Sequence, residues 1–189
     1  AVGNAVELQE AVDTLKGMGP ADFRQHCLTM ASQMLLLAGK YQSEPDARDE
    51  LAALLDGGQA LAKFQEWISA QGGDISFVKD PSLLPRAKFI QELQAPRSGY
   101  VAALDAREVG LTSMLLGGGR AKKSDLVDHA VGIVLQAKIG DRDTDGQPLL
   151  TIHANDGAKL SGAQQRLFAA FEWSDEPVSP PPLLHEVIS

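Results

Sequence analysis

Apolar residues recur at spacings of three and four along the first ~70 residues, a pattern typical of amphipathic helices. Residues that favour helix N-termini precede these runs, and glycines that stop helices follow them. The predicted helices are about Ala5–Lys16, about Pro20–Ala38, the segment between Ser43 and Gly57, and about Gln59–Gln71. Asn4 and Glu7 form an Asn-x-x-Glu capping box at the start of the first helix.

The second predicted helix carries an apolar stripe, which consists of Phe23, Cys27, Met30, Met34 and Leu37. Helices of globular proteins turn such a stripe towards the core, so we expect these side chains to be buried. Cys27 is the single cysteine, which excludes an internal disulfide and a thiolate metal cluster. We therefore interpret Cys27 as a core residue.

After Pro85 the pattern shifts towards the alternation and the short apolar runs that are typical of strands. The predicted strands are Ala87–Ala95, Gly99–Leu104, Val131–Ala137 and Leu149–Ala154. The predicted helices of this half are about Ala106–Leu116 and about Gly162–Trp173, and Leu183–Ile188 is predicted as an edge strand. A helical first half and a β-rich second half predict an α+β fold.

The chain is acidic, with 17 Lys and Arg against 25 Asp and Glu and a formal net charge of −8. Binding to a phosphate backbone needs clustered cations, and base stacking needs aromatic side chains, which make up only 5% of this sequence. We therefore expect no nucleic-acid partner.

No segment predicts contact with a membrane. The longest apolar run, Met34–Ala38, is too short to cross a bilayer. The N-terminus lacks the basic flank and apolar core of a secretory signal, and it begins at Ala1 rather than at a methionine. We expect a cytoplasmic protein whose beginning is missing.

An acidic segment matches the opening of a calcium-binding loop, because Asp141, Asp143 and Asp145 alternate before Gly146. The twelfth position of such a loop carries a bidentate glutamate, but Ile152 occupies it here. We favour a solvated turn, since Asp and Gly suit sharp backbone angles.

A glycine run, Gly117 to Gly119, precedes Arg120, Lys122 and Lys123. Bare backbone amides beside cations can cradle a phosphate, but the spacing is not that of a nucleotide-binding loop. A helix C-terminal turn beside a solvated basic patch is the favoured interpretation.

No catalytic motif stands out among the remaining residues. The histidines have no metal-ligand spacing and are interpreted as structural; they are His26, His129, His153 and His185. Glu7 and Glu10 lie three apart on one helix, and Glu10 is the carboxylate without a capping role. The sequence also lacks the Gly-x-Ser-x-Gly and His-Glu-x-x-His patterns.

Several motifs, in order along the whole chain, together resemble the pyrimidine-nucleoside phosphorylases, which include thymidine phosphorylase. They are Ala1-Val2-Gly3-Asn4-Ala5-Val6-Glu7, Leu15-Lys16-Gly17-x-Gly19-Pro20, Ala70-Gln71-Gly72-Gly73-Asp74, Leu116 to Lys123 with Asp125 and Asp128, Ala130-Val131-Gly132-Ile133, Lys138-Ile139-Gly140-Asp141 and Thr151-Ile152-His153-Ala154-Asn155. The resemblance covers only the C-terminal part of such an enzyme, close to half of it. It implies that the residues that bind phosphate and base lie outside this chain.

The resemblance implies reversible phosphorolysis of thymidine, uridine or deoxyuridine to the free base and a pentose 1-phosphate, with inorganic phosphate as co-substrate. It also implies a homodimeric parent protein. The chain alone should lack the active site. Bacterial members bind a structural potassium ion, and the resemblance assigns two of its ligands to the backbone carbonyl of Ala1 and the carboxylate of Glu10.

The resemblance also predicts two domains. Residues 1–96 are expected to be the mostly helical end of a large α/β domain, and residues 97–189 a β-rich domain like a barrel-sandwich hybrid. That second domain is related to lipoyl and biotinyl carrier domains. Asp143 stands where an apolar residue is usual, so we expect the start of its strand to be more exposed.

Two other functions remain open. A non-catalytic lipoyl-like interaction module would use the same fold, although no carrier lysine tripeptide occurs in the sequence. A related nucleoside-monophosphate phosphorylase is also compatible with the pattern, but no second phosphate clamp is visible.

Overall fold

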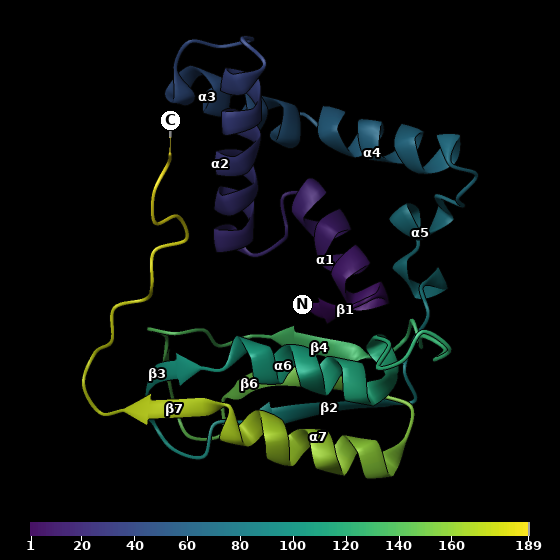
Figure 1. The fold of residues 1–189 in the computed structure, drawn as a ribbon, viewed down its shortest axis with the longest axis vertical. Helices are drawn as coiled ribbons and strands as arrows, with labels where there is room; N and C mark the ends of the chain where they lie inside the picture. Colours follow the sequence, from purple (N-terminus) through teal and green to yellow (C-terminus); the bar gives the residue numbers. More distant parts are fainter. Residues whose placement is uncertain (189) are drawn as a thin grey trace. The chain divides into compact units, whose positions relative to one another are not determined.

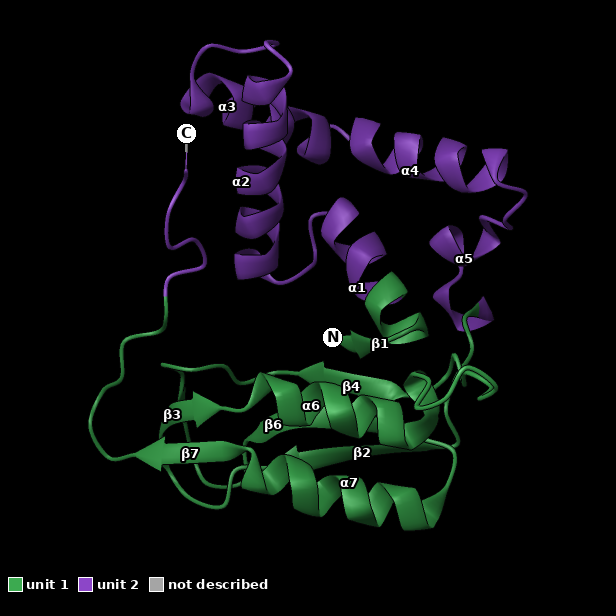
Figure 2. Cartoon of the chain, in the orientation of Figure 1, with its two compact units in different colours: residues 1–8, 84–181 green, residues 9–83, 182–189 purple. Residues whose placement is uncertain are grey.

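The computed structural model describes residues 1–188 and divides into two compact units. Unit 1 comprises residues 1–8 and 84–181, and unit 2 comprises residues 9–83 with the C-terminal tail from Pro182 (Figures 1 and 2). Within the described residues we find no helix whose length and apolar character would let it span a bilayer. The predicted division into domains 1–96 and 97–189 stays a prediction.

The predicted helices of the first half are confirmed. Helix α1 starts in unit 1 and continues into unit 2, and the others belong to unit 2. Their bounds are α1 Ala5–Leu15, α2 Ala21–Leu37, α3 Glu44–Asp56, α4 Gln59–Ala70 and the short α5 Ser76–Lys79, before a 3-10 turn at Pro81–Leu83. Ser43 caps α3 by accepting a hydrogen bond from the Asp46 amide at 3.3 Å. Gly39, which follows α2, has a φ of 64°, a left-handed conformation that glycine adopts at little cost.

The predicted burial of the apolar stripe on α2 is wrong. Phe23, Cys27, Met30, Met34 and Leu37 are all exposed, so Cys27 is not a core residue. The buried residues of α2 are Leu28 and Ser32, and this face packs against α3. The stripe is apolar as predicted, but the described residues do not cover it.

Unit 1 is built on two antiparallel sheets. The four-stranded sheet has the order β1-β4-β6-β2, and the three-stranded sheet has the order β5-β3-β7. The strands are β1 Val2–Gly3, β2 Phe89–Gln94, β3 Gly99–Leu104, β4 Gly132–Leu135, β5 Arg142–Asp143, β6 Pro148–Ala154 and β7 Phe171–Ser174. Helices α6 (Ala106–Ser113) and α7 (Gly157–Ala169) lie side by side against the four-stranded sheet (Figure 1).

The core of unit 1 lies between this sheet and the two helices. Val109 of α6, Ile133 of β4, Ile152 of β6 and Leu167 of α7 belong to one buried apolar cluster. The predicted α+β class is confirmed. The barrel-sandwich detail is not confirmed, because within the described residues the two sheets are open and do not close into a barrel.

The C-terminal part departs from the sequence-based expectation in two places. The predicted helix Gly162–Trp173 is α7 at Gly157–Ala169 followed by strand β7, which pairs with β3. Asp156 caps α7 by accepting a hydrogen bond from the Lys159 amide at 2.9 Å. The predicted edge strand Leu183–Ile188 is wrong, because those residues form no strand.

The expected exposure near the start of β5 is also wrong. Asp143 is only 2% exposed, and its Oδ2 atom has no hydrogen-bond partner in the described structure. A carboxylate therefore occupies a position that packing has taken out of water, even though an aspartate normally stays solvated.

Candidate functional site

Strand β1 brings the N-terminal segment onto the edge of the four-stranded sheet. It pairs with β4, with Val2 opposite Ile133 and Gly3 opposite Gly132. The two backbones approach so closely that a Cβ atom on Gly132 would lie 2.8 Å from the Val2 carbonyl oxygen. Glycine at this position therefore lets the N-terminal segment pair with the sheet.

The end of α6 and the glycine run after it hold this segment through one side-chain hydroxyl and one backbone carbonyl. After α6, a turn of π-helix covers Met114–Gly118, and Gly117 has a φ of 119°. The Asn4 side-chain amide donates to the Gly118 carbonyl at 2.9 Å, and the Ser113 hydroxyl donates to the Val2 carbonyl at 3.2 Å. These bonds join residues more than a hundred positions apart in the sequence.

Asp128 and Asn155 extend the same network. The Asp128 amide donates to the Gly117 carbonyl at 2.9 Å, and its carboxylate accepts from the Asn155 side-chain amide at 2.7 Å and from the Ala130 amide at 3.0 Å. We call the side chains of Asn4, Ser113, Asp128 and Asn155, with the carbonyls of Gly117 and Gly118, the polar clasp. The polar clasp fixes the segment that leads into α1.

The predicted capping box at α1 is only partly formed. Asn4 stands at the N-cap position, where its carbonyl accepts from the Leu8 amide at 3.0 Å. Glu7 Oε1 accepts from the Gly3 amide at 2.7 Å, one residue ahead of the expected donor. The Asn4 side chain bonds instead to Gly118, as described above. A long-range contact has therefore replaced a local cap.

In the basic loop after the glycine run, backbone amides already bind the carboxylate of Asp125, which lies in the same loop. The amides of Ala121 and Lys122 donate to Asp125 Oδ2 at 3.1 and 2.8 Å, and Arg120 Nε donates to the Asp125 carbonyl at 3.1 Å. The amides of Ala121 and Lys122, beside the glycine run, are thus already satisfied by a side chain of the loop. This geometry favours the turn interpretation over a phosphate site.

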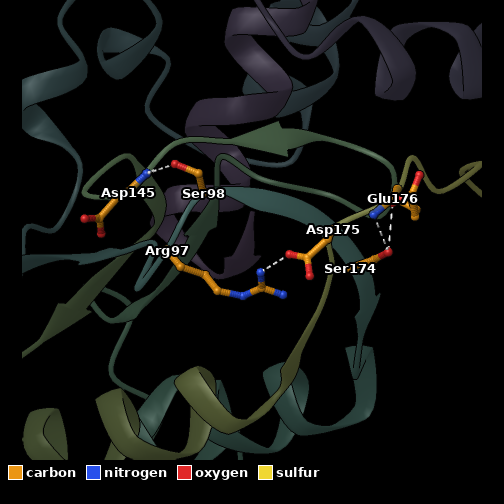
Figure 3. Close-up of polar contacts among 6 residues, drawn as sticks. All are labelled: Arg97, Ser98, Asp145, Ser174, Asp175 and Glu176. Atoms are coloured by element: carbon orange, nitrogen blue, oxygen red, sulfur yellow. Dashed lines mark hydrogen bonds and ion pairs between the residues drawn. The ribbon is translucent and has the colours of Figure 1, made fainter.

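The acidic segment from Asp141 to Asp145, which precedes β6, is held by hydrogen bonds that are typical of a turn. Asp141 Oδ2 accepts from the Lys138 amide at 2.8 Å, and the Asp145 amide donates to Ser98 Oγ at 3.0 Å. Figure 3 shows the Asp145 carboxylate directed away from Ser98. Within residues 1–188 no group of three or more His, Cys, Asp or Glu is arranged to hold a metal ion. These hydrogen bonds show a turn, but Asp143 within it is buried, so the turn is not solvated throughout as expected.

Electrostatics single out Asp143 within that turn. Burial raises the pKa of its carboxyl above the usual aspartate range, and the negative charge of Asp141 raises it further. Nearby, Arg97 forms an ion pair with Asp175, and the Ser174 hydroxyl donates to the Glu176 carbonyl at 2.8 Å (Figure 3). Asp143 is thus the buried carboxyl group of the turn, and the Asp141 carboxylate beside it accepts a backbone hydrogen bond.

The predicted potassium ligands lie in different compact units. Ala1 directly precedes β1 in unit 1, and Glu10 lies within α1 in the part assigned to unit 2. A carbonyl and a carboxylate are the oxygen donors that suit a hard cation, but two donors do not complete a coordination shell. The assignment of Ala1 and Glu10 therefore stays a prediction, and no chemical step is derived through the ion.

The histidines do not form an acid–base pair with a nucleophile in the described structure. His153 lies on β6, where burial and then the positive charge of Arg86 lower its pKa and favour the neutral imidazole. The His129 carbonyl accepts from the Ala5 amide at 3.0 Å. His129 also lines, with Glu7, a hollow of about 510 Å³ beside the start of α1. The arrangement positions the backbone and provides no visible catalytic group.

Sequence reasoning named several members of the polar clasp without recognising their roles. Gly117, Asp128 and Asn155 belong to motifs that carry the family resemblance, but local patterns do not show that they meet. Gly117 lies near the end of the π-helical turn, Asp128 in the segment before β4, and Asn155 directly after β6, so all three stand where a regular element begins or ends.

Comparison with known proteins agrees with the resemblance. Residues 100–174 match the profile of the pyrimidine nucleoside phosphorylase C-terminal domain. The chain is 45% identical over 189 residues to the pyrimidine-nucleoside phosphorylase of Geobacillus stearothermophilus, and 44% identical over 189 residues to that of Staphylococcus aureus strain USA300. It spans only 43% of the length of each relative.

Proposed function

We propose that the parent protein of this chain is a pyrimidine-nucleoside phosphorylase. The chain is similar over its whole length to the C-terminal part of such enzymes. The reaction would be reversible phosphorolysis of thymidine, uridine or deoxyuridine, in which phosphate attacks the anomeric carbon and the base departs. The observation that carries the proposal is 45% identity along all 189 residues. Similarity of that extent includes both compact units.

This chain would act as a scaffold. The polar clasp ties the segment after Ala1 to the four-stranded sheet, and a tied segment can hold a neighbouring group in a constant place. We propose that the Ala1 carbonyl and the Glu10 carboxylate then supply part of a potassium site. A bound cation there would add positive charge close to the anionic co-substrate, and the remaining ligands would come from elsewhere in the parent protein.

Catalysis would rest on positioning and on charge stabilisation. Phosphate is already an anion, and the sugar gains positive character as the glycosidic bond breaks, so oriented groups matter more than a protein nucleophile. The described residues show no such constellation around a cavity. We therefore expect the isolated chain to be inactive, with phosphate and nucleoside bound by the other part of a homodimeric cytoplasmic enzyme.

No observation favours the two alternatives. A carrier module needs an exposed lysine at the tip of a hairpin, but the turn from Asp141 to Pro148 has none. A nucleoside-monophosphate phosphorylase needs a second phosphate clamp, and the amides of the basic loop bind Asp125 instead.

A chimera tests the proposal. The part of the Geobacillus stearothermophilus relative that precedes the matched region is joined to Ala1, and thymine or uracil release from thymidine and uridine is measured with and without phosphate. We expect phosphate-dependent release by the chimera and none by the isolated chain. A folded chimera without activity, beside an active full-length relative, would contradict the proposal, and so would activity of the isolated chain.

A further inference from the structure

The apolar stripe of α2 is exposed, although its sequence pattern predicts burial. Its exposure increases towards the end of the helix, from 37% at Phe23 to 64% at Met34 and 90% at Leu37. The five side chains follow the spacing of three and four that brings residues onto one helix face. Because they share one helix face, they differ from scattered single exposed residues, which are common on protein surfaces.

The opposite face of α2 packs within unit 2. Leu28 and Ser32 are buried, and at 100° per residue they lie about 140–180° around the helix from the apolar stripe. That side packs on α3, where Arg24 pairs with Asp56 at 2.8 Å and Arg48 donates to the Thr29 hydroxyl at 2.8 Å. The helix therefore has one face that packs within unit 2 and a second apolar face that does not.

The composition of the stripe is that of a protein core. Two methionines, a phenylalanine, a leucine and a cysteine make it up, and no charged residue interrupts it. Residues of these types are usually buried in folded proteins. Methionine side chains in addition fit irregular partner surfaces, because they are unbranched and flexible.

We infer that the apolar stripe is the docking surface for the part of a phosphorylase that precedes this chain. The inference rests on the proposed function. The relatives align with the chain over 100% of its length, yet that region is only 43% of theirs. More than half of each relative thus remains to cover a face that this chain leaves bare. Burial of such a face removes apolar area from water, which is the main driving force for association.

The experiment below also distinguishes two other ways to cover the apolar stripe. A second copy of the chain would cover the stripe in a dimer of the isolated protein. The tail also carries exposed apolar residues, Leu183, Leu184, Val187 and Ile188, and would cover the stripe within one molecule. Either would leave the preceding part of the enzyme without a role at this surface.

The experiment uses the 189-residue chain and, as the probe, the tagged preceding part of the Geobacillus stearothermophilus phosphorylase. The two are produced together, and the amount of chain that co-purifies with the tag is measured. The variants are Met34→Lys and Leu37→Lys. The matched control is Leu126→Lys, because Leu126 is 93% exposed, as uncovered as Leu37, but belongs to unit 1 and not to α2.

We expect the wild-type chain and Leu126→Lys to co-purify and to yield phosphate-dependent base release. Met34→Lys and Leu37→Lys should lower the co-purified amount by about tenfold or more, since buried apolar anchors dominate binding. The same variants should leave the far-ultraviolet circular dichroism of the isolated chain unchanged, because Met34 and Leu37 are 64% and 90% exposed.

Several results would overturn the inference. Co-purification of Met34→Lys and Leu37→Lys at wild-type level, with active complexes, would show a wrong surface while the proposed function stands. A wild-type chain that forms a dimer in sedimentation analysis, which Met34→Lys converts to monomer, would assign the stripe to self-association. Removal of residues 183–188 could instead raise the co-purified amount while Met34→Lys has no effect. That result would assign the apolar stripe to the tail. Absence of any wild-type complex and of chimera activity would overturn both proposals.

Discussion

Unit 1 and unit 2 differ in how completely each buries its own apolar residues. In unit 1 two sheets and two helices enclose a continuous cluster that includes Ile133, Leu150 and Leu167. Among the described residues of unit 2, the buried apolar side chains are Val12, Leu28, Ala47 and Val78. No residue of α4 is buried, although α4 is twelve residues long.

The difference shows that regular helices do not by themselves make a closed domain. Helices form from local capping and spacing, but their stability in proteins comes mostly from packing of an apolar face. In unit 1 the four-stranded sheet and helices α6 and α7 bury apolar residues of one another in a single cluster. Unit 2 has well-defined helices, and the structure leaves the apolar face of α2 uncovered. This contrast can be tested by perturbing each unit separately.

The largest effect should come from the core of unit 1. Leu167→Ala removes a fully buried side chain and should lower the free energy of unfolding by about 2–5 kcal/mol. Met34→Ala in unit 2 should change it by less than about 0.5 kcal/mol, because Met34 is exposed. Urea unfolding followed by Trp173 fluorescence in a Trp67→Phe background reports unit 1, and circular dichroism reports the helices. Equal losses for both variants would break the comparison.

A smaller loss is expected when the polar clasp is opened. Asp128→Ala leaves the Asn155 side-chain amide and the Ala130 amide without their acceptor, which should cost about 1–3 kcal/mol. The control is Asp145→Ala, whose carboxylate is exposed and whose amide bond to Ser98 is retained. Urea unfolding monitored at Trp173 measures both. If Asp145→Ala cost as much as Asp128→Ala, the clasp would not be a distinct support of unit 1.

The smallest effect should be the pH dependence contributed by Asp143. Its pKa is raised in the folded protein, so the native state holds the proton more tightly than the unfolded chain does. Ionisation of Asp143 therefore weakens the native state as the pH rises through the folded pKa. Asp143→Asn should stabilise unit 1 at pH 7, and the gain should vanish as the pH falls to about 3.9, the ordinary aspartate pKa.

Urea midpoints of wild type, Asp143→Asn and Asp145→Asn at several pH values between these limits check this expectation. The exposed Asp145 serves as the control and should show no such trend. A gain for Asp143→Asn that stays constant with pH would mean that shape, and not charge, decides the effect.

Local signals predicted most of the helices and strands because their causes are local. Ser43 caps α3 and a left-handed glycine follows α2, as the spacing indicated. Gly99–Leu104 was predicted with its observed bounds, since its apolar run lies between turn residues. The segment after α7 was misassigned, because Phe171–Ser174 becomes a strand by pairing with β3, about seventy residues earlier in the chain.

The candidate site depended on contacts that no local pattern contains. Asn4 looked like a helix cap, and only the fold shows that its side chain reaches Gly118. Asp143 looked like a solvated turn residue, and only the fold buries it. In each case a neighbour distant in the sequence competes with the local interaction and wins.

By itself, the sequence determined the α+β class, the helix bounds of the first half and the family resemblance, because capping, spacing and short motifs are properties of neighbouring residues. It also determined that α2 has one apolar face. Which face of α2 is buried was decided by α3, and where the N-terminal segment lies was decided by β4 and the polar clasp. Burial and long-range hydrogen bonds belong to pairs of elements, so only the tertiary structure could settle them.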